Sequence, residues 1–358
     1  GNGGYNIYVS DNGGPFLLAG TTPAGDTDFV HTGMTQFHTY CYYVVAYNTT
    51  NTITASSEHV CVFANVPQQP VFNYLRVATV AGSDIVNLKA YVDVTADVTR
   101  YDVYRSDSLL GPYVLIGNVP ANPPNSVVLF TDNTPQTNMQ SYYYKMIAVD
   151  SCGADAMTSN IGRTIYLQAW SNDEITNTLN WNDYEQWLGG VLHYNIYRTI
   201  DGVPDPVPVN TIPFTNAINN VYTDDVSQYN HYIGRFGYQI EGVEGPGNIY
   251  NFTDTTYSNV AEVVQKPLVY VPNAFTPNGN GLNDLFQPSL GFVDIVDYKF
   301  DVFNRWGELI YETDDTSGGW DGRYKGHKCE PDVYVWLLTF KTASGQFIDQ
   351  KGTVTLLR

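Results

Sequence analysis

The sequence predicts an all-β chain built as a row of β-sandwiches. Aromatic and β-branched residues favour strands, while Gly and Pro favour turns, and this chain has 29 Tyr together with 31 Gly and 19 Pro. A strand-like phrase recurs three times along the chain. In the longest apolar runs, alternate residues are apolar, which places one apolar stripe on each strand.

The recurring phrase occupies residues 5–10, 101–106 and 194–199, at spacings of 96 and 93 residues. Repetition at a fixed period indicates a tandem array. Each copy continues through a loop that contains Gly and Pro to an expected aromatic strand, which holds Phe29, Phe130 or Tyr222.

Earlier strands are expected at 86–94 and 178–181 in the second and third copies, and the first copy has no counterpart of them. Gly1 begins directly inside a strand pattern, without a signal peptide, so we expect the N-terminus to be the edge of a fragment.

Each copy then has a period-2 run that starts at Tyr40, Tyr142 or Phe236, and the third copy also has Leu-Asn-Trp at 179–181. These features resemble fibronectin type III modules, Ig-like β-sandwiches of about 100 residues with a core Trp and a tyrosine corner. Phe236 departs from the pattern because it has no hydroxyl for the corner hydrogen bond.

The resemblance covers residues 1–266 and implies one partial module and two complete ones. The final residues form another unit, expected to be a seven-stranded β-sandwich. The predicted domains are 1–66, 67–166, 167–266 and 267–358.

Modules of this kind joined in series form a stalk, which is the interpretation we favour for residues 1–266. The alternative is that exposed Tyr, Trp and loop residues bind a glycan or another surface. Trp187, in a loop-like segment, is the best candidate, although it is equally able to cap the edge of its own sandwich.

Of the four cysteines, Cys41 and Cys61 lie symmetrically about residue 51 in a polar turn. The symmetry places them opposite each other in a hairpin and predicts a disulfide, hence an oxidising compartment; two buried thiols are the alternative. Cys152 and Cys329 have no evident partners, and no pair has the spacing of a structural zinc site.

The net charge of −19 argues against nucleic-acid binding, because such a chain repels phosphate. The acidic excess belongs mainly to residues 1–266, since residues 267–358 hold 8 Lys and Arg against 12 Asp and Glu. No apolar run reaches the length of about 18 residues that a transmembrane helix needs.

The last unit begins with a strand at 269–275 and a Gly/Asn loop at 277–284. Further strands are expected at 295–303, 308–312, 332–341 and 346–357. Its sequence motifs are, in chain order, VPNAFTPNGNGLNDLF, FDVFNRWGELIYE, GGWDGRYKG, DVYVWLLTF and the terminal KGTVTLLR.

These phrases closely resemble the gliding-motility-associated C-terminal domain, the type B C-terminal signal domain of type IX secretion. Two positions depart from that pattern: Asn280 replaces the usual Asp, and Asp332 or Val333 replaces the usual Gly. The resemblance implies a cargo exported by a type IX translocon and held at, or released from, the cell surface and outer membrane. It implies a PorP/SprF-like outer-membrane barrel as partner, and a PorV-type carrier barrel as a second candidate.

We expect Phe275, Phe286, Trp306 and Trp320 to pack in the core or in turns. Asn304 and Asp321 are expected to bond the local backbone of their turns, and Arg305 and Arg323 are candidates to pair with them. The alternative is that this loop end, with the edge of the last strand, docks on the secretion partner, for which strand addition is a natural mode. The residues that the resemblance assigns to this contact are Phe275, Pro277, Asn278, Gly279, Gly281, Asn283, Asp284, Phe286, Asn304, Arg305, Trp306, Gly307, Trp320, Asp321, Gly322, Gly352, Leu356, Leu357 and Arg358.

The 278–284 loop partly resembles a calcium loop, but it holds one carboxylate, Asp284, and no downstream Glu at the required spacing. We therefore expect no metal and no cofactor. Six scattered histidines and the absence of hydrolase, P-loop and Rossmann motifs argue against an enzyme. The carboxylate pairs at 224–225 and 314–315 are expected in solvated turns.

Two functional classes follow. The first is the C-terminal part of a gliding-type surface adhesin, with a stalk and an export and attachment signal. The second is a secreted hydrolase whose catalytic domain lies upstream of Gly1. The adhesion ligand, a glycan or another extracellular surface, stays unassigned.

Overall fold

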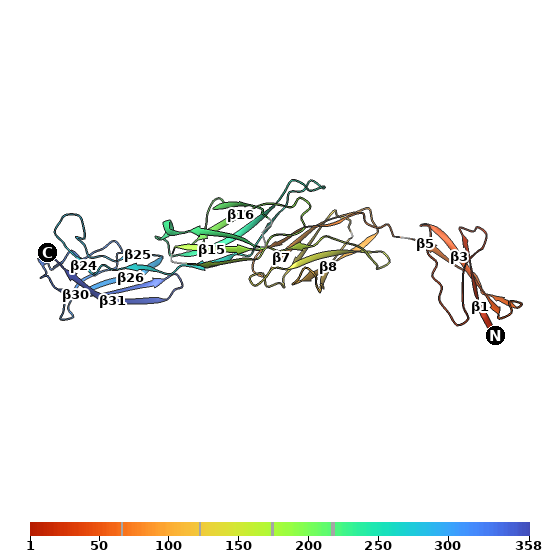
Figure 1. Cartoon of the computed structure of the whole chain (residues 1–358), viewed down its shortest axis with the longest axis horizontal. Coiled ribbons are helices and arrows are strands. Elements are labelled where there is room, and N and C mark those ends of the chain that lie inside the picture. Colours follow the sequence, from red (N-terminus) through yellow and green to blue (C-terminus); the bar gives the residue numbers. More distant parts are fainter. Residues whose placement is uncertain (66, 122, 173–174, 216–218) are drawn as a thin grey trace.

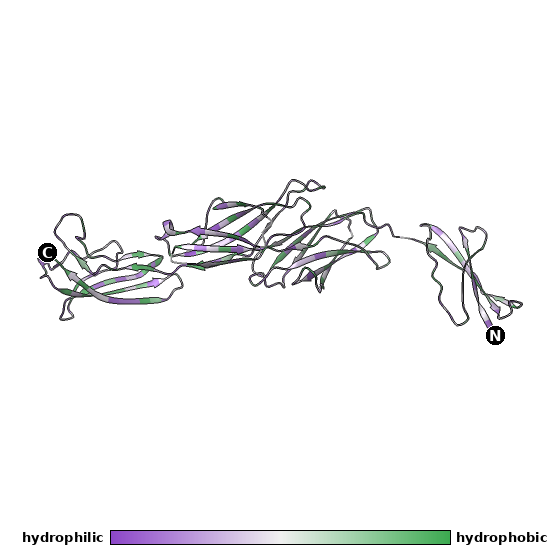
Figure 2. Cartoon of the chain, viewed as in Figure 1, coloured by the Kyte–Doolittle hydropathy of each residue, from purple (hydrophilic) through white to green (hydrophobic). Residues whose placement is uncertain are grey.

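The computed structural model describes residues 1–65, 67–121, 123–172, 175–215 and 219–358. Four β-rich units follow one another along an elongated chain, with the N-terminus at one end and the C-terminus at the other (Figure 1). Apolar and polar residues are interspersed along the strands (Figure 2). We find no helix within these ranges with the length and apolar character needed to cross a membrane.

The first unit is a single sheet of order β2-β1-β3-β4, in which β5 also pairs with β3. Cys41 and Cys61 are register partners between β3 and β5, and their sulfur atoms are 2.01 Å apart in a disulfide. The strands are β1 (Asn2–Asp11), β2 (Leu17–Thr22), β3 (His38–Asn48), β4 (Thr54–Ser56) and β5 (Val60–Ala64).

The strand expected at Phe29 is wrong. Phe29 lies outside the strands and covers Gly20, where an added Cβ atom would stand 2.5 Å from the ring. Its counterparts Phe130 and Tyr222 lie in strands that pair with an early strand of their own units. Residues 1–65 contain no strand equivalent to those early ones, so the segment at Phe29 has no partner among them.

The second unit has two sheets, of order β10-β7-β6 and β12-β11-β8-β9, with β13 pairing with β11. The early strand expected at 86–94 ends at Val92, and another strand precedes it. The strands are β6 (Asn73–Val80), β7 (Val86–Val92), β8 (Val98–Ser106), β9 (Val114–Pro120), β10 (Val127–Asp132), β11 (Tyr143–Asp150), β12 (Asp155–Thr158) and β13 (Gly162–Arg163).

The third unit repeats this plan, with sheets of order β14-β15-β19 and β17-β16-β20-β21 and with β18 on β16 and β22 on β20. The elements are β14 (Leu167–Ser171), β15 (Thr176–Trp181), β16 (Val191–Ile200), β17 (Val203–Pro204), β18 (Asn210–Pro213), β19 (Asn220–Asp225), the 3-10 helix η1 (Ser227–Tyr229), β20 (Arg235–Glu244), β21 (Thr255–Tyr257) and β22 (Ala261–Val264). Trp181 is fully buried and packs edge-on against Tyr194.

The expected tyrosine corners are present in the first two units. The Tyr40 hydroxyl accepts a hydrogen bond from the Thr35 amide at 2.8 Å, and the Tyr142 hydroxyl accepts one from the Gln136 amide at 3.0 Å. Phe236 makes no such bond. Its ring instead meets Phe292 of the last unit, with the ring centroids 6.1 Å apart.

The prediction of a solvated turn at 224–225 is wrong, because Asp224 lies inside β19 and is buried. Its carboxylate accepts hydrogen bonds from the Arg198 guanidinium and from the Tyr238 hydroxyl, the latter at 2.7 Å. A buried charge needs such partners, and these contacts make Asp224 part of the packing of the third unit.

The last unit has a five-stranded sheet of order β24-β31-β30-β26-β27 and two small strand pairs, β23-β25 and β28-β29. The single strand expected at 269–275 is interrupted at Pro272, which cannot donate a ladder hydrogen bond. The strands are β23 (Leu268–Tyr270), β24 (Ala274–Phe275), β25 (Ser289–Gly291), β26 (Val293–Phe303), β27 (Leu309–Thr313), β28 (Arg323–Tyr324), β29 (His327–Lys328), β30 (Val333–Thr342) and β31 (Phe347–Leu356).

The second and third units share one continuous core through their joint. Arg76 lies in that joint and its guanidinium binds the Asp254 carboxylate through two nitrogens, at 2.7 and 2.9 Å. The Tyr184 hydroxyl accepts a hydrogen bond from the Ala78 amide at 2.9 Å. By contrast, among the described residues we find no hydrogen bond or ion pair between the first unit and the later ones.

Candidate docking surface of the last domain

The opening loop of the last unit is held by its own hydrogen bonds. Asp284 accepts hydrogen bonds from the Gly279 amide at 2.6 Å and from the Gly281 amide at 2.7 Å. These bonds lower the pKa of the Asp284 carboxyl. Gly279, Gly281 and Asn283 have positive φ, which explains the Gly and Asn at these positions. The carboxylate therefore shapes the loop on which Asn278 and Asn283 are displayed.

Four of the residues assigned to the partner contact are buried: Phe275, Phe286, Trp320 and Leu356. Phe275 packs on Phe286 and Trp320, at centroid distances of 5.7 and 5.3 Å, and Phe286 and Trp320 form a β-bridge. As expected, these aromatic rings are core. They support the loops and have no surface with which to touch a partner.

Three further assigned residues pack locally. A Cβ atom at Gly322 would stand 3.0 Å from Pro277, and one at Gly352 would stand 2.5 Å from the Trp336 ring. The two glycines thus let neighbouring side chains approach the backbone closely. Near the C-terminus, Arg358 donates to the Gly322 carbonyl at 3.2 Å, while Leu357 is exposed.

Trp306 contradicts the expectation of core or turn packing, because its side chain is 85% exposed. It lies in the turn between β26 and β27. A side chain in this turn is exposed because it has no face of the sheet to pack against. The Asn304 carboxamide fixes this turn, since its oxygen accepts hydrogen bonds from the Trp306 and Glu308 amides, both at 3.0 Å. Gly307 completes the turn at φ +79°.

The expected pairing of Arg305 with Asn304 or Asp321 is also wrong, because Arg305 forms an ion pair with Asp332. Arg323 does lie near Asp321, with its Nε atom 3.7 Å from the carboxylate. Asp321 also accepts a hydrogen bond from the Arg323 amide at 3.0 Å, which shapes its own turn.

Beside Trp306 lies an open groove of about 420 Å³ that the sequence did not indicate. It combines the β26–β27 turn with the β28–β29 hairpin and the start of β30, so its members are separated along the chain. The hairpin has a sequence signal, Lys-Gly between short strands, because both residues of such a turn need positive φ, and Lys325 and Gly326 have it. The lining includes Asn304, Arg305, Trp306, Tyr324, Lys325, His327, Lys328, Cys329, Glu330, Asp332 and Tyr334.

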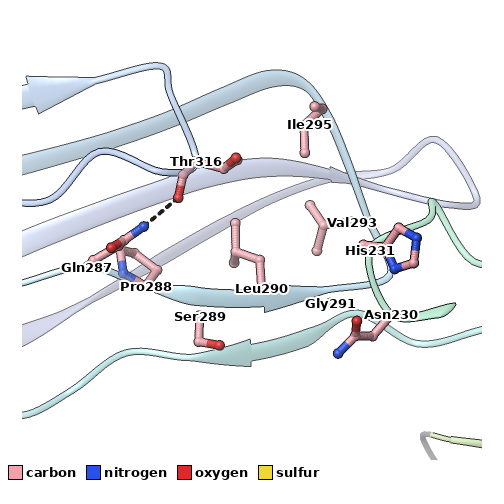
Figure 3. Close-up of a pocket in the computed structure, with 10 residues that line it drawn as sticks. All are labelled: Asn230, His231, Gln287, Pro288, Ser289, Leu290, Gly291, Val293, Ile295 and Thr316. Carbon is pink, nitrogen blue, oxygen red and sulfur yellow. Dashed lines mark hydrogen bonds between the residues drawn. The ribbon is translucent and has the colours of Figure 1, made fainter. Parts of the chain in front are cut away.

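A second pocket, of about 530 Å³, lies where the last unit meets the third (Figure 3). Asn230 and His231 of the third unit face Leu290, Val293 and Ile295 of the last unit across it. The neighbouring Phe292 is fully buried, and its amide donates to the Asn230 carbonyl at 2.7 Å. No periodicity identifies Phe292, because it follows the short β25 at a positive φ of 52°.

Trp187 does not form an exposed binding site. It is 6% exposed, its ring lies tilted against Tyr184 with the centroids 4.1 Å apart, and its indole nitrogen donates to the Arg76 carbonyl of the second unit. It therefore caps the neighbouring module at the joint and not the edge of its own sandwich.

Residues 269–356 match the family model described as the CHU_C type IX secretion signal domain. The last domain is a type IX secretion signal domain. Its presence implies interaction with the type IX secretion machinery and export to the cell surface or the extracellular space. The groove beside Trp306 and the buried aromatic rings both belong to this signal domain.

Two solved structures are similar to much of the chain. The tetra-tandem repeat in the extending region of a large adhesion protein has 12% identity, a TM-score of 0.27, and coverage of 99% of this chain and 92% of its own. The chicken CNTN1 FN1-FN3 domains have 11% identity, a TM-score of 0.20, and coverage of 82% and 99% respectively. No curated protein matches the chain. The strand pairings of the chain itself establish tandem all-β units, of which the second and third each have two sheets.

Proposed function

We propose that this chain is part of a cell-surface adhesin of the gliding-motility type. The β-sandwich units act as a stalk, and the signal domain directs export and attachment at the outer membrane. The observation that carries the proposal is a secretion signal domain at the end of a row of stalk-like modules. We also propose that these residues have no catalytic role.

The joints support the role of a stalk. Buried contacts lock the second unit to the third and the third to the signal domain, through Arg76–Asp254 and Phe292 respectively. An inflexible row of modules holds whatever precedes it at a fixed distance from the attachment point. The proposed attachment partners are a PorP/SprF-like barrel or a PorV-type carrier barrel.

The test is to fuse residues 267–358 to a soluble reporter in a bacterium that has this secretion system, and to compare it with a fusion of residues 167–358. We expect surface delivery of the longer fusion, and its loss when the cognate barrel gene is deleted. The longer fusion retains the module that covers Phe292, so it controls for misfolding of the isolated signal domain. Delivery no greater than that of the untagged reporter, for both fusions, would refute the proposal.

A further inference from the structure

The signal domain exposes one indole ring to solvent, on a turn that hydrogen bonds hold in place. Trp306 is 85% exposed, whereas the next most exposed of the six tryptophans, Trp170, is 44% exposed. The Asn304 hydrogen bonds described above leave the turn little freedom. Exposed aromatic rings on ordered backbone are typical anchors of protein interfaces, because they bury a large area at a small cost in conformational entropy.

The floor of the adjacent groove is also ordered. Tyr334 donates from its hydroxyl to the Glu330 carbonyl at 2.9 Å, and the Cys329 amide donates to the Gly322 carbonyl at 2.9 Å. The groove therefore exists before a partner arrives. A preformed groove lowers the ordering cost of binding.

The side chains that line the groove carry one more positive than negative charge, with Arg305, Lys325 and Lys328 against Glu330 and Asp332. Asp332 is paired with Arg305, and Glu308 accepts hydrogen bonds from Asn304 and from the Tyr324 hydroxyl, at 3.0 and 2.9 Å. Among the described residues, Lys325 and Lys328 make no ion pair. The Lys325 ammonium lies 4.7 Å from the centre of the Tyr324 ring, and Tyr324 and then Glu308 raise the pKa of Lys325. Glu330 is the one lining carboxylate for which we find no side-chain bond within the described part of the chain.

On this basis, and resting on the proposed function, we propose that the groove beside Trp306 binds an acidic loop of the type IX secretion machinery. An apolar side chain of the loop packs on Trp306 and Tyr324, and its carboxylates meet Lys325 and Lys328. In a chain of net charge −19, two exposed ammonium groups that belong to no ion pair, beside an exposed indole, form a site complementary to an acidic peptide.

The direct test titrates the purified full chain with synthetic peptides that correspond to the acidic surface loops of type IX outer-membrane proteins. We expect one of them to bind, and binding to weaken with added salt because the contact is exposed. The Trp306→Ala variant and the Lys325→Glu/Lys328→Glu variant should each weaken it about tenfold or more. The matched controls are Trp170→Ala and Lys351→Glu, which change an exposed indole and an exposed ammonium elsewhere.

Two further probes separate the alternatives. The same peptides with Asn and Gln in place of Asp and Glu should bind at least about tenfold more weakly. Vesicles of equal parts phosphatidylcholine and phosphatidylglycerol should not compete with the acidic peptide. Equal binding of the neutral peptides, preferential binding to the vesicles, or no binding of any peptide would each overturn the inference.

Surface delivery distinguishes failure of this inference from failure of the proposed function. Deletion of residues 267–358 tests the function, and the groove variants test the docking site. If deletion blocks delivery while the Trp306→Ala and double Lys variants, with unchanged melting temperatures, are delivered like the parent chain, the signal function stands and the groove is not its docking site. If deletion has no effect, the proposed function itself fails.

Discussion

Replacing Arg76 by Met should open the joint between the second and third units. Arg76 is buried, binds Asp254 through two nitrogens, and lies with its guanidinium carbon 3.4 Å from the centre of the Phe252 ring. Removing one member of a buried ion pair leaves the other charge without compensation and costs about 3–5 kcal/mol. Lys89, 3.4 Å from the same carboxylate, remains and partly offsets the loss. We expect a cost near the lower end, about 3 kcal/mol.

Hydrogen exchange measures this cost at the joint itself. The Ala78 amide donates to Tyr184 and the Tyr257 amide donates to Thr79, so both bonds cross the joint. A loss of about 3 kcal/mol corresponds to roughly a hundredfold faster exchange when opening limits it. The Met146 amide, which donates to Ser159 within the second unit, serves as the internal reference.

The matched control is Arg105→Met, which removes the partner of the buried Asp132 inside the second unit. This control should accelerate exchange at Met146 at least as much as at Ala78. In a double-mutant cycle, Asp254→Asn added to Arg76→Met should cost much less than Asp254→Asn alone. Unchanged exchange of the Ala78 and Tyr257 amides in Arg76→Met would show that the ion pair does not hold the joint.

Three other changes test separate features. Phe292→Ala removes a fully buried ring and should cost about 3–5 kcal/mol, lowering the calorimetric melting temperatures of both the third unit and the signal domain; a change confined to the signal domain would contradict the shared packing. Cys41→Ser/Cys61→Ser opens a bridge with a sequence separation of 20 and should cost about 3 kcal/mol in denaturant unfolding of the first unit, whereas Cys152→Ser should have no effect. The backbone hydrogen bonds that lower the pKa of Asp284 stabilise the folded signal domain above the ordinary pKa of 3.8, and this stability is lost as the pH falls through the lower folded pKa. The free energy of unfolding of the signal domain should therefore depend less steeply on pH below 3.8 in Asp284→Asn. A pH profile parallel to that of the parent chain would contradict this.

The repeats and the half-buried strands were predictable because the alternation of apolar residues reports which face of a strand is buried. The symmetry of Cys41 and Cys61 about a turn likewise placed both residues on adjacent strands. Each of these predictions depends on neighbours within one unit, where the pattern of the chain itself carries the information.

The predictions for Trp187 and Trp306 failed because the neighbours of Trp187 come from another unit and no strand sets the direction of the Trp306 side chain. Trp187 is buried by Arg76, which is 111 positions away in the sequence. Phe292 enters a neighbouring core after the three residues of β25. Trp306 sits in a turn, so alternation carries no information about its exposure. The groove beside it is formed by three segments that are separated in the sequence, so it could not be predicted before the fold was known.

The contrast between the joints has a mechanical consequence. Buried side chains tie the second, third and last units together, whereas among the described residues we find no hydrogen bond or ion pair between the first unit and the second. A force on the second unit therefore reaches the signal domain through packed side chains, first at Arg76 and Asp254 and then at Phe292.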